Sequence, residues 1–199
     1  NRYVLSYNGE IYNFIELRKE LEKKGVNFRT NTDTEILLKG LVEEGTEFLL
    51  KCNGMWAFCL WDRKLEKAIL GRDRFGVKPL FYSMINSKNF IFGSEMKSIT
   101  PFLDHLIPSK DIDEMTKRIF TYEQTEECVI DGIKRVEADY YLIYENNKIT
   151  KKRYWNRWVK NSQGKAEKEL LRRFKSYLTA AKKRYAKRIE KIDSQEKSL

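Results

Sequence analysis

The sequence has no run of apolar residues that approaches the length of a membrane-spanning helix, which needs about 20. Its first residues, Asn1-Arg2-Tyr3-Val4, are not those of a signal peptide. They also lack an initiator methionine and have the pattern of the middle of a strand. We therefore expect a fragment of a longer protein, with no membrane as partner.

Cysteine and histidine are scarce. The three cysteines, Cys52, Cys59 and Cys128, form no CxxC pair, and no cluster of histidines accompanies them because His105 is the only one. Metal sites and disulfide frameworks need paired or clustered ligands, so we expect neither. Cys59 lies in an apolar run, as is typical of a buried thiol, and we interpret His105 as a loop residue. Reduced thiols without a targeting signal indicate a cytoplasmic protein.

The net charge of +10 is not spread evenly. Residues 151–199 hold 17 of the 39 lysines and arginines and 5 of the 29 acidic residues, a net charge of +12, so residues 1–150 carry −2. Apolar residues spaced by three or four over 165–192 predict a long basic amphipathic helix. Such a helix can bind nucleic acid or an anionic surface. We favour a solvated face whose apolar stripe packs on another domain.

Hydrophobic patterning predicts helices first and strands afterwards. Two capping-box patterns mark helix starts, namely Asn13 with Glu16 and Thr32 with Glu35. Glycines at 25 and 45 are expected to end these helices. Shorter helical segments are expected at 47–51, 94–99 (limited by Pro101) and 113–120. The predicted strands are 3–7, 56–61, 68–70, 80–84, 90–92, 140–144 and 149–155, the last two forming a hairpin. This order indicates stacked layers of sheet and helix, an α+β protein.

Four polar residues could act together on an amide substrate. Covalent amide hydrolysis needs a nucleophile, a base, donors for the oxyanion, and groups that fix the charged end of the substrate. The side-chain amide of Asn8 and the N–H of Gly9 can both point at one oxygen, and Glu10 could hold an ammonium group. Taken alone, Asn8-Gly9 predicts a hairpin turn, and Asp33 complements a helix dipole.

The order of motifs across residues 7–97 changes that interpretation. The segments are Asn8-Gly9-Glu10-Ile11-Tyr12-Asn13, Thr32-Asp33-Thr34-Glu35, Gly54-Met55-Trp56-Ala57-Phe58, Arg72 to Tyr82, and Ser94-Glu95-Met96-Lys97. Together they resemble class II glutamine amidotransferases. The first segment and the later Arg153-Tyr154-Trp155 resemble the branch of glutamine-dependent asparagine synthetases. We interpret Arg72 to Tyr82 as scaffold, in which Arg72 and Asp73 can pair and Gly76 and Pro79 make a turn.

The resemblance implies an N-terminal-nucleophile fold, a four-layer αββα sandwich that is incomplete here and followed by the basic helix. It implies that Asn8 and Gly9 form the oxyanion hole, and that Glu10 and Asp33 bind the α-amino group of glutamine. The nucleophile of the family is a processed N-terminal cysteine whose own α-amine is the base. That position would precede Asn1, as would the arginine that binds the α-carboxylate, so we expect this fragment to be inactive.

The resemblance also implies a domain organisation. Residues 1–104 would be the glutamine amidotransferase domain without its N-terminal strands and nucleophile. Residues 105–155 would be a connector and hairpin toward a synthetase domain, with Glu137-Ala138-Asp139 in place of the usual Pro-Gly-His stretch. Residues 156–199 would be the basic tail: the first synthetase helix, a degraded or frame-shifted end, or a binding arm.

No Ser-Gly-Gly-x-Asp-Ser loop and no other phosphate-binding glycine loop occurs in the sequence. We therefore expect no cofactor in the fragment, and the resemblance implies ATP and magnesium for the parent enzyme. The implied function is the glutaminase half of an asparagine synthetase, with glutamine, the synthetase domain and a second copy in a homodimer as partners. The alternatives are an amidotransferase for another carboxylate acceptor, and a non-catalytic remnant that binds proteins or nucleic acid.

Overall fold

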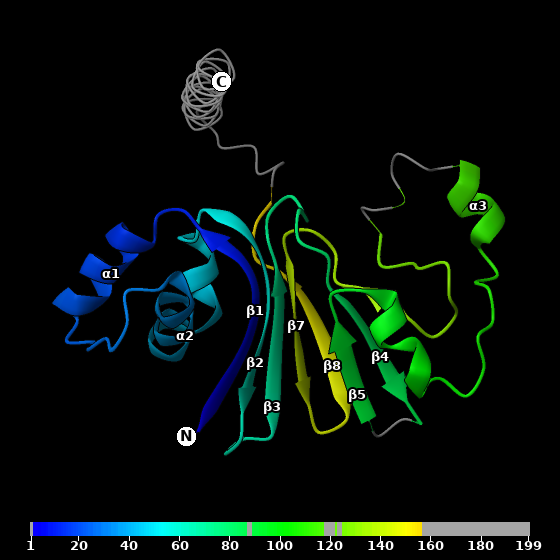
Figure 1. Ribbon diagram of the computed structural model, residues 1–199, viewed down its shortest axis with the longest axis horizontal. Helices are drawn as coiled ribbons and strands as arrows, with labels where there is room; N and C mark the ends of the chain where they lie inside the picture. The colour runs from blue at the N-terminus through cyan, green and yellow to red at the C-terminus, as the bar shows by residue number, and fades with distance from the viewer. Residues whose placement is uncertain (1, 87–88, 118–121, 123–124, 157–199) are drawn as a thin grey trace, which may run out of the picture. The chain divides into compact units, whose positions relative to one another are not determined.

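Two antiparallel sheets pack face to face, and helices cover the outer face of the larger one (Figure 1). The computed structural model describes residues 2–86, 89–117, 122 and 125–156. In sheet A the strand order is β1 (Tyr3–Ile11), β2 (Gly54–Asp62), β3 (Lys67–Arg72), β7 (Tyr140–Glu145) and β8 (Lys148–Arg153). In sheet B it is β5 (Asn89–Gly93), β4 (Phe81–Ile85) and β6 (Lys134–Arg135). The predicted α+β class is confirmed.

The helices are short, and the two longest lie between the first strand and the second. They are α1 (Phe14–Lys23), α2 (Asp33–Glu44), the 3-10 helices η1 (Gly45–Leu50), η2 (Met96–Ser98) and η3 (Thr100–Phe102), and α3 (Ile112–Lys117). No helix of the described ranges is long and apolar enough to cross a membrane. The basic helix predicted at 165–192, and the end of the helix predicted at 113–120, lie outside the described residues.

The two capping-box predictions have different outcomes. Asn13 does precede α1, but its side chain makes no capping bond. It bonds instead to the loop before β2, donating to the carbonyl of Lys51 and accepting from the N–H of Asn53. Thr32 does cap α2, because its hydroxyl accepts from the N–H of Glu35. The prediction that Asn13 caps α1 is therefore wrong, while the predicted starts of both helices are confirmed.

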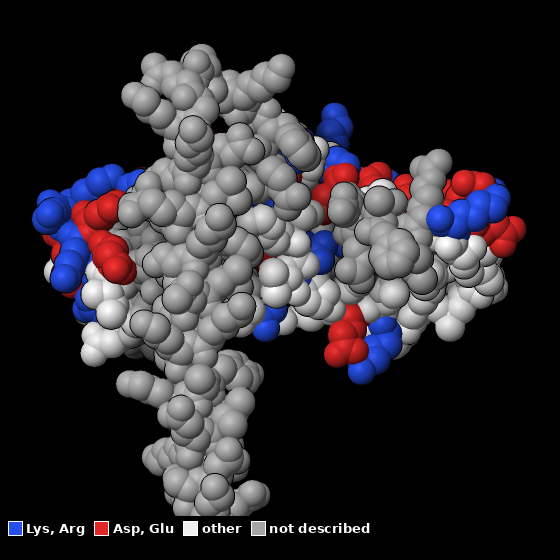
Figure 2. Space-filling model, turned by 90° about the horizontal axis from the view of Figure 1, so that it is seen from above, with Lys and Arg blue, Asp and Glu red and all other residues white. Residues whose placement is uncertain are grey.

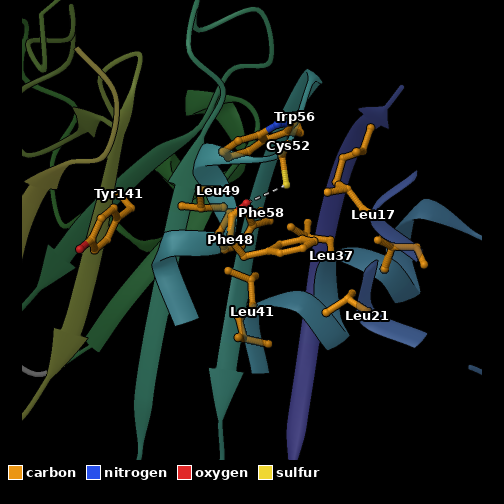
Figure 3. Close-up of a cluster of buried hydrophobic side chains, with 13 residues drawn as sticks. Leu17, Leu21, Leu37, Leu41, Phe48, Leu49, Cys52, Trp56, Phe58 and Tyr141 are labelled. Carbon is orange, nitrogen blue, oxygen red and sulfur yellow. Dashed lines mark hydrogen bonds between the residues drawn. The ribbon is translucent and has the colours of Figure 1, made fainter. Parts of the chain in front are cut away.

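A first hydrophobic core lies between sheet A and the helices (Figure 3). Trp56 and Phe58 of β2 project into it, and each is 1% exposed. Leu37, Phe48 and Leu49 close it from α2 and η1. Burial of a large apolar side chain contributes roughly 1.5–3 kcal/mol, so this cluster holds α1 and α2 against the sheet and fixes where α2 begins.

A second core lies between the two sheets. It contains Ala57, Cys59, Leu70, Leu80, Tyr82, Val136 and Leu142, all buried. Residues 56–60 of β2 are buried without interruption, because alternate side chains enter the two cores. The prediction that this strand is buried on both faces is therefore confirmed.

The strands β7 and β8 form the predicted hairpin and belong to sheet A. β7 pairs with β3, and β8 pairs with β7. Leu142 is fully buried in the core between the sheets. Residues 140–153, placed by the sequence in a connector, thus share their core with strands β2 and β3, and residues 1–156 form one compact unit.

Short 3-10 turns cover the far face of sheet B. Ile99 packs there with Phe81, Cys128 and Ile133. A short helix limited by Pro101 was expected over 94–99. Only the 3-10 helix η2 forms there, and Pro101 does not end the helical region, because it lies inside the next 3-10 helix, η3. Proline is tolerated in the first turn of a helix because that N–H has no intrahelical partner. His105 is an exposed loop residue, as predicted.

Acidic and basic side chains lie beside each other on the face drawn in Figure 2, outside the grey atoms. Ion pairs among the described residues include Lys24 with Glu44, and Lys51 with Glu20 and Glu44. Pairs of this kind contribute little to stability. The mixture of charges seen on this face agrees with the small net charge of residues 1–150.

The loop between β3 and β4 is organised by two buried charged residues. Asp73 is 0% exposed, and its carboxylate accepts from the N–H groups of Trp56, Phe75, Val77 and Lys78 at 3.0–3.3 Å. Arg72 donates to the carbonyls of Gly76, Lys78 and Val136. Gly76 has φ +63°, as a tight turn requires. These contacts support the scaffold interpretation of the segment.

We predict that Asp73→Ala lowers the free energy of unfolding by about 2 kcal/mol or more, since the buried N–H of Trp56 and three partly buried N–H groups of the loop lose their acceptor, and a fully buried donor left unpaired costs roughly 1–3 kcal/mol. Asp73→Asn retains one oxygen and should lose less. Chemical denaturation of the variants measures both effects. The exposed Asp104→Ala is the matched control and should change stability by less than about 0.5 kcal/mol. Equal losses for Asp73→Ala and Asp104→Ala would contradict the assignment.

Candidate active site

Strand β1 has one edge on β2 and one edge without a strand partner among the described residues. The N–H of Tyr12 donates to the carbonyl of Asn53, on the β2 side, at 2.7 Å. The N–H of Ile11 points the other way and donates to Oδ2 of Asp33 at 3.0 Å. Because the N–H groups of alternate residues in an antiparallel strand share an edge, the N–H of Gly9 also faces the free edge.

Gly9 does not lie in a turn. It lies within β1 with φ +154°, opposite Trp56 of β2. A Cβ at this position would come within 2.3 Å of the carbonyl oxygen of Met55 and 2.5 Å of Cα of Trp56. The turn predicted from Asn8-Gly9 alone is therefore wrong. The glycine allows a close approach of two strands, and this approach leaves its N–H on the free edge.

Asp33 is the first residue of α2 and lies beside the same free edge. Its Oδ2 accepts from the hydroxyl of Tyr7 at 2.8 Å as well as from the N–H of Ile11. Residues two apart on a strand are separated by about 7 Å. The carboxylate of Asp33 and the N–H of Gly9 are thus close enough to contact one glutamine-sized molecule.

Asn8 and Glu10 approach this edge from the opposite face of the strand. Even-numbered residues of β1 face sheet B, where Val4 and Ser6 line an apolar hollow of about 370 Å³ between the sheets. The amide of Asn8 donates weakly to the hydroxyl of Ser94, at 3.5 Å. Glu10 is exposed. The structure therefore brings Gly9 and Asp33 to one edge, with Asn8 adjacent and Glu10 beyond it.

Two residues with contacts in this region had no assigned role in the sequence analysis. Tyr7 contacts Asp33, and Ser94 contacts Asn8. Tyr7 has the strand pattern of an ordinary core residue, and only its contact with Asp33 distinguishes it. Ser94 lies in one of the quoted motifs, next to β5, which is distant in sequence from β1. Long-range contacts of this kind carry no local sequence signal.

None of the three cysteines can act as a nucleophile in this arrangement. All are buried and free, and Cys52 donates to the carbonyl of Phe48 within the first core (Figure 3). Burial raises the pKa of Cys52 and Cys59 to about 12 and that of Cys128 to about 11. The reactive species is the thiolate, so these thiols are inert near neutral pH. The prediction that Cys59 is buried is confirmed.

Comparison with known proteins decides the family. The chain matches the description "Glutamine amidotransferase domain" over residues 1–155. The chain belongs to this glutamine amidotransferase domain family. It is 36% identical over 157 residues to asparagine synthetase (glutamine-hydrolyzing) 3 of Bacillus subtilis (strain 168), covering 77% of this chain and 25% of that protein. Its identity to asparagine synthetase (glutamine-hydrolyzing) 1 of the same strain is 36% over 172 residues, covering 83% and 26%.

This amidotransferase domain spans about a quarter of the length of those relatives. Among solved structures it is similar to the glutamine phosphoribosylpyrophosphate amidotransferase from B. subtilis complexed with ADP and GMP. The TM-score is 0.55 at 20% identity, covering 77% of this chain and 29% of the other. That likeness establishes the fold, so the stacked sheets and helices implied by the motifs are confirmed.

We predict that Gly9→Ala destabilises the domain by about 3 kcal/mol or more, because it adds a clash with backbone atoms to an unfavourable φ. Gly25→Ala separates the two causes: Gly25 has φ +85° but no atom within 4 Å of a Cβ. Gly25→Ala should lower the free energy of unfolding by only about 1 kcal/mol. Urea denaturation of both variants gives the comparison. A loss for Gly9→Ala no larger than that for Gly25→Ala would argue against the close approach of the strands.

We also predict that the native domain resists thiol modification. With pKa values raised to about 11–12, only about one thiol in a thousand or fewer is ionised at pH 8, and burial blocks access as well. An aromatic disulfide reagent should therefore react with all three cysteines only after denaturant is added. Rapid reaction of one thiol in the folded state would show an accessible nucleophile that the structure does not contain.

Proposed function

We propose that this chain is the glutaminase domain of a glutamine-dependent asparagine synthetase. In the parent enzyme it would release ammonia from glutamine for the ATP-dependent amidation of aspartate. One observation carries the proposal: the carboxylate of Asp33 binds the N–H of Ile11 on the free edge of β1, two residues or roughly 7 Å along the strand from the N–H of Gly9. The 36% identity to glutamine-hydrolyzing asparagine synthetases supports it.

The chemistry follows from these positions. As the amide carbon of glutamine is attacked, its oxygen gains negative charge, and the N–H of Gly9 and the amide of Asn8 would donate to it. Loss of one such donor typically costs on the order of 10²–10³ in rate. The carboxylates of Asp33 and Glu10 would attract the α-ammonium group. The structure supports Asp33 in this role more strongly than Glu10, because Asp33 is held at the edge by two hydrogen bonds.

The nucleophile and the group that binds the α-carboxylate would come from residues outside this sequence. Cys52, Cys59 and Cys128 are buried in the cores, so the 199 residues alone would not hydrolyse glutamine. ATP and magnesium would act in the remaining three quarters of the parent, since we assign no residue of this chain to either. We propose that the parent enzyme is cytoplasmic and that its synthetase domain is the partner of this domain. We also propose that the parent forms a homodimer.

An amidotransferase for another acceptor shares this chemistry, because the glutamine site does not contact the acceptor. The solved phosphoribosylpyrophosphate amidotransferase shares the fold but is only 20% identical in sequence to this chain. The relatives at 36% identity are glutamine-hydrolyzing asparagine synthetases. This difference favours aspartate as the acceptor of the parent enzyme.

The proposal predicts that L-glutamine shifts the backbone amide resonance of Gly9 and the side-chain amide resonance of Asn8 in the labelled chain, without release of ammonia. Asp33→Ala removes the carboxylate for the α-ammonium group, so it should weaken the response at least about tenfold. The exposed Asp104→Ala is the control and should respond like the unaltered chain. Unshifted resonances would overturn the glutamine site, and ammonia release would overturn the proposed inactivity.

A further inference from the structure

Two donors converge on one oxygen of Asp33. The hydroxyl of Tyr7 lies 2.8 Å from Oδ2, and the N–H of Ile11 lies 3.0 Å from the same atom. No described residue donates to the other oxygen, Oδ1. The carboxylate is thus held through one oxygen, and the second oxygen keeps its lone pairs for a ligand.

Tyr7 is the side chain that joins β1 to the start of α2, beside the backbone bond from Ile11 to Asp33. It lies on β1, two residues before Gly9, and its ring packs against the core beneath α1 and α2. Asp33 begins α2, where Thr32 caps the helix. The Tyr7–Asp33 bond therefore joins the strand that presents the N–H of Gly9 to the helix that presents the carboxylate.

The Tyr7 hydroxyl is also a permanent donor. Burial raises the pKa of Tyr7 strongly, and the hydrogen bond to Asp33 raises it further. The phenol consequently stays protonated across the whole physiological range and never opposes the carboxylate with a charge of its own. Asp33 contacts the phenol directly, the buried Cys52 nearby is neutral, and the charge of Glu10 acts on it only weakly, from the opposite face of β1.

We propose that Tyr7 is a positioning residue, which turns the carboxylate of Asp33 so that Oδ1 faces the free edge of β1 and receives the α-ammonium group of the substrate. This inference rests on the proposed glutamine site. It makes Tyr7 the residue that couples recognition of an α-amino group to the oxyanion donor two residues further along the strand.

The experiment compares Tyr7→Phe with Tyr3→Phe in the full 199-residue chain. Tyr3 lies on the same strand and the same face, packs against the same core, and has no bond to Asp33. Two ligands are titrated by NMR: L-glutamine, and 4-carbamoylbutanoate, which is glutamine without its α-ammonium group. Hydrogen exchange of the Ile11 amide in the absence of ligand reports on its bond to Asp33.

Tyr7→Phe should weaken binding of L-glutamine about tenfold and leave binding of 4-carbamoylbutanoate unchanged, because only the former uses Oδ1. It should also speed exchange of the Ile11 amide about tenfold, and Tyr3→Phe should do neither. Equal weakening for both ligands would show a structural loss and overturn the inference. So would unchanged exchange at Ile11, whether or not glutamine binds. Absence of glutamine binding by the unaltered chain, with Ile11 exchange altered in Tyr7→Phe, would instead refute the proposed glutamine site.

Discussion

The close contact between β1 and β2 is the constraint on which the site depends. Gly9 packs directly over the backbone of Trp56, and a Cβ at Gly54 would lie 2.0 Å from the carbonyl oxygen of Glu10. Two glycines on facing strands thus let the backbones approach more closely than side chains permit. The register of this pairing turns the N–H of Gly9 to the open edge, while Trp56 on the other strand anchors the first core.

The core and the site share the same few elements, so stability and function are linked. α2 is held by Ile36 and Leu37, which are fully buried, and its first residue is Asp33. On the other side of β2, Asp73 accepts from the N–H of Trp56 and from its own loop. The glycine, the carboxylate and the tryptophan are therefore positioned by one continuous set of buried contacts.

Sequence patterns predicted the elements well where local chemistry decides them. Thr32 and Gly45 bounded α2 correctly, and the run from Trp56 to Trp61 identified a strand buried on both faces. They failed where a long-range contact overrides a local preference. Asn8-Gly9 has the composition of a turn, yet β2 holds it in a strand. Asn13 has the composition of a helix cap, yet the loop before β2 engages its side chain.

The candidate site was predictable only as a set of motifs in order. Gly9 and Asp33 could be associated because the family resemblance joins them across a gap in sequence that no local rule spans. The bond from Tyr7 to Asp33 could not be inferred, because a tyrosine in an alternating strand has the same pattern whether its hydroxyl has a partner or not. The face of the strand on which each side chain lies could be inferred, because side chains alternate along a strand. Asn8 and Glu10 therefore share one face, and Tyr7 lies on the other.

The two edge strands of sheet A differ in charge, and this difference affects where a ligand can bind. β8 at one edge carries Lys148, Lys151, Lys152 and Arg153, charges that discourage another strand from pairing there. β1 carries no charged residue from Tyr3 to Gly9. At the end of the free edge of β1, the N–H of Ile11 already donates to Asp33. Another strand therefore could not pair with β1 beyond Ile11. Among the described residues, the N–H of Gly9 is the next donor along this edge, so an oxygen bound there would lie close to the carboxylate of Asp33.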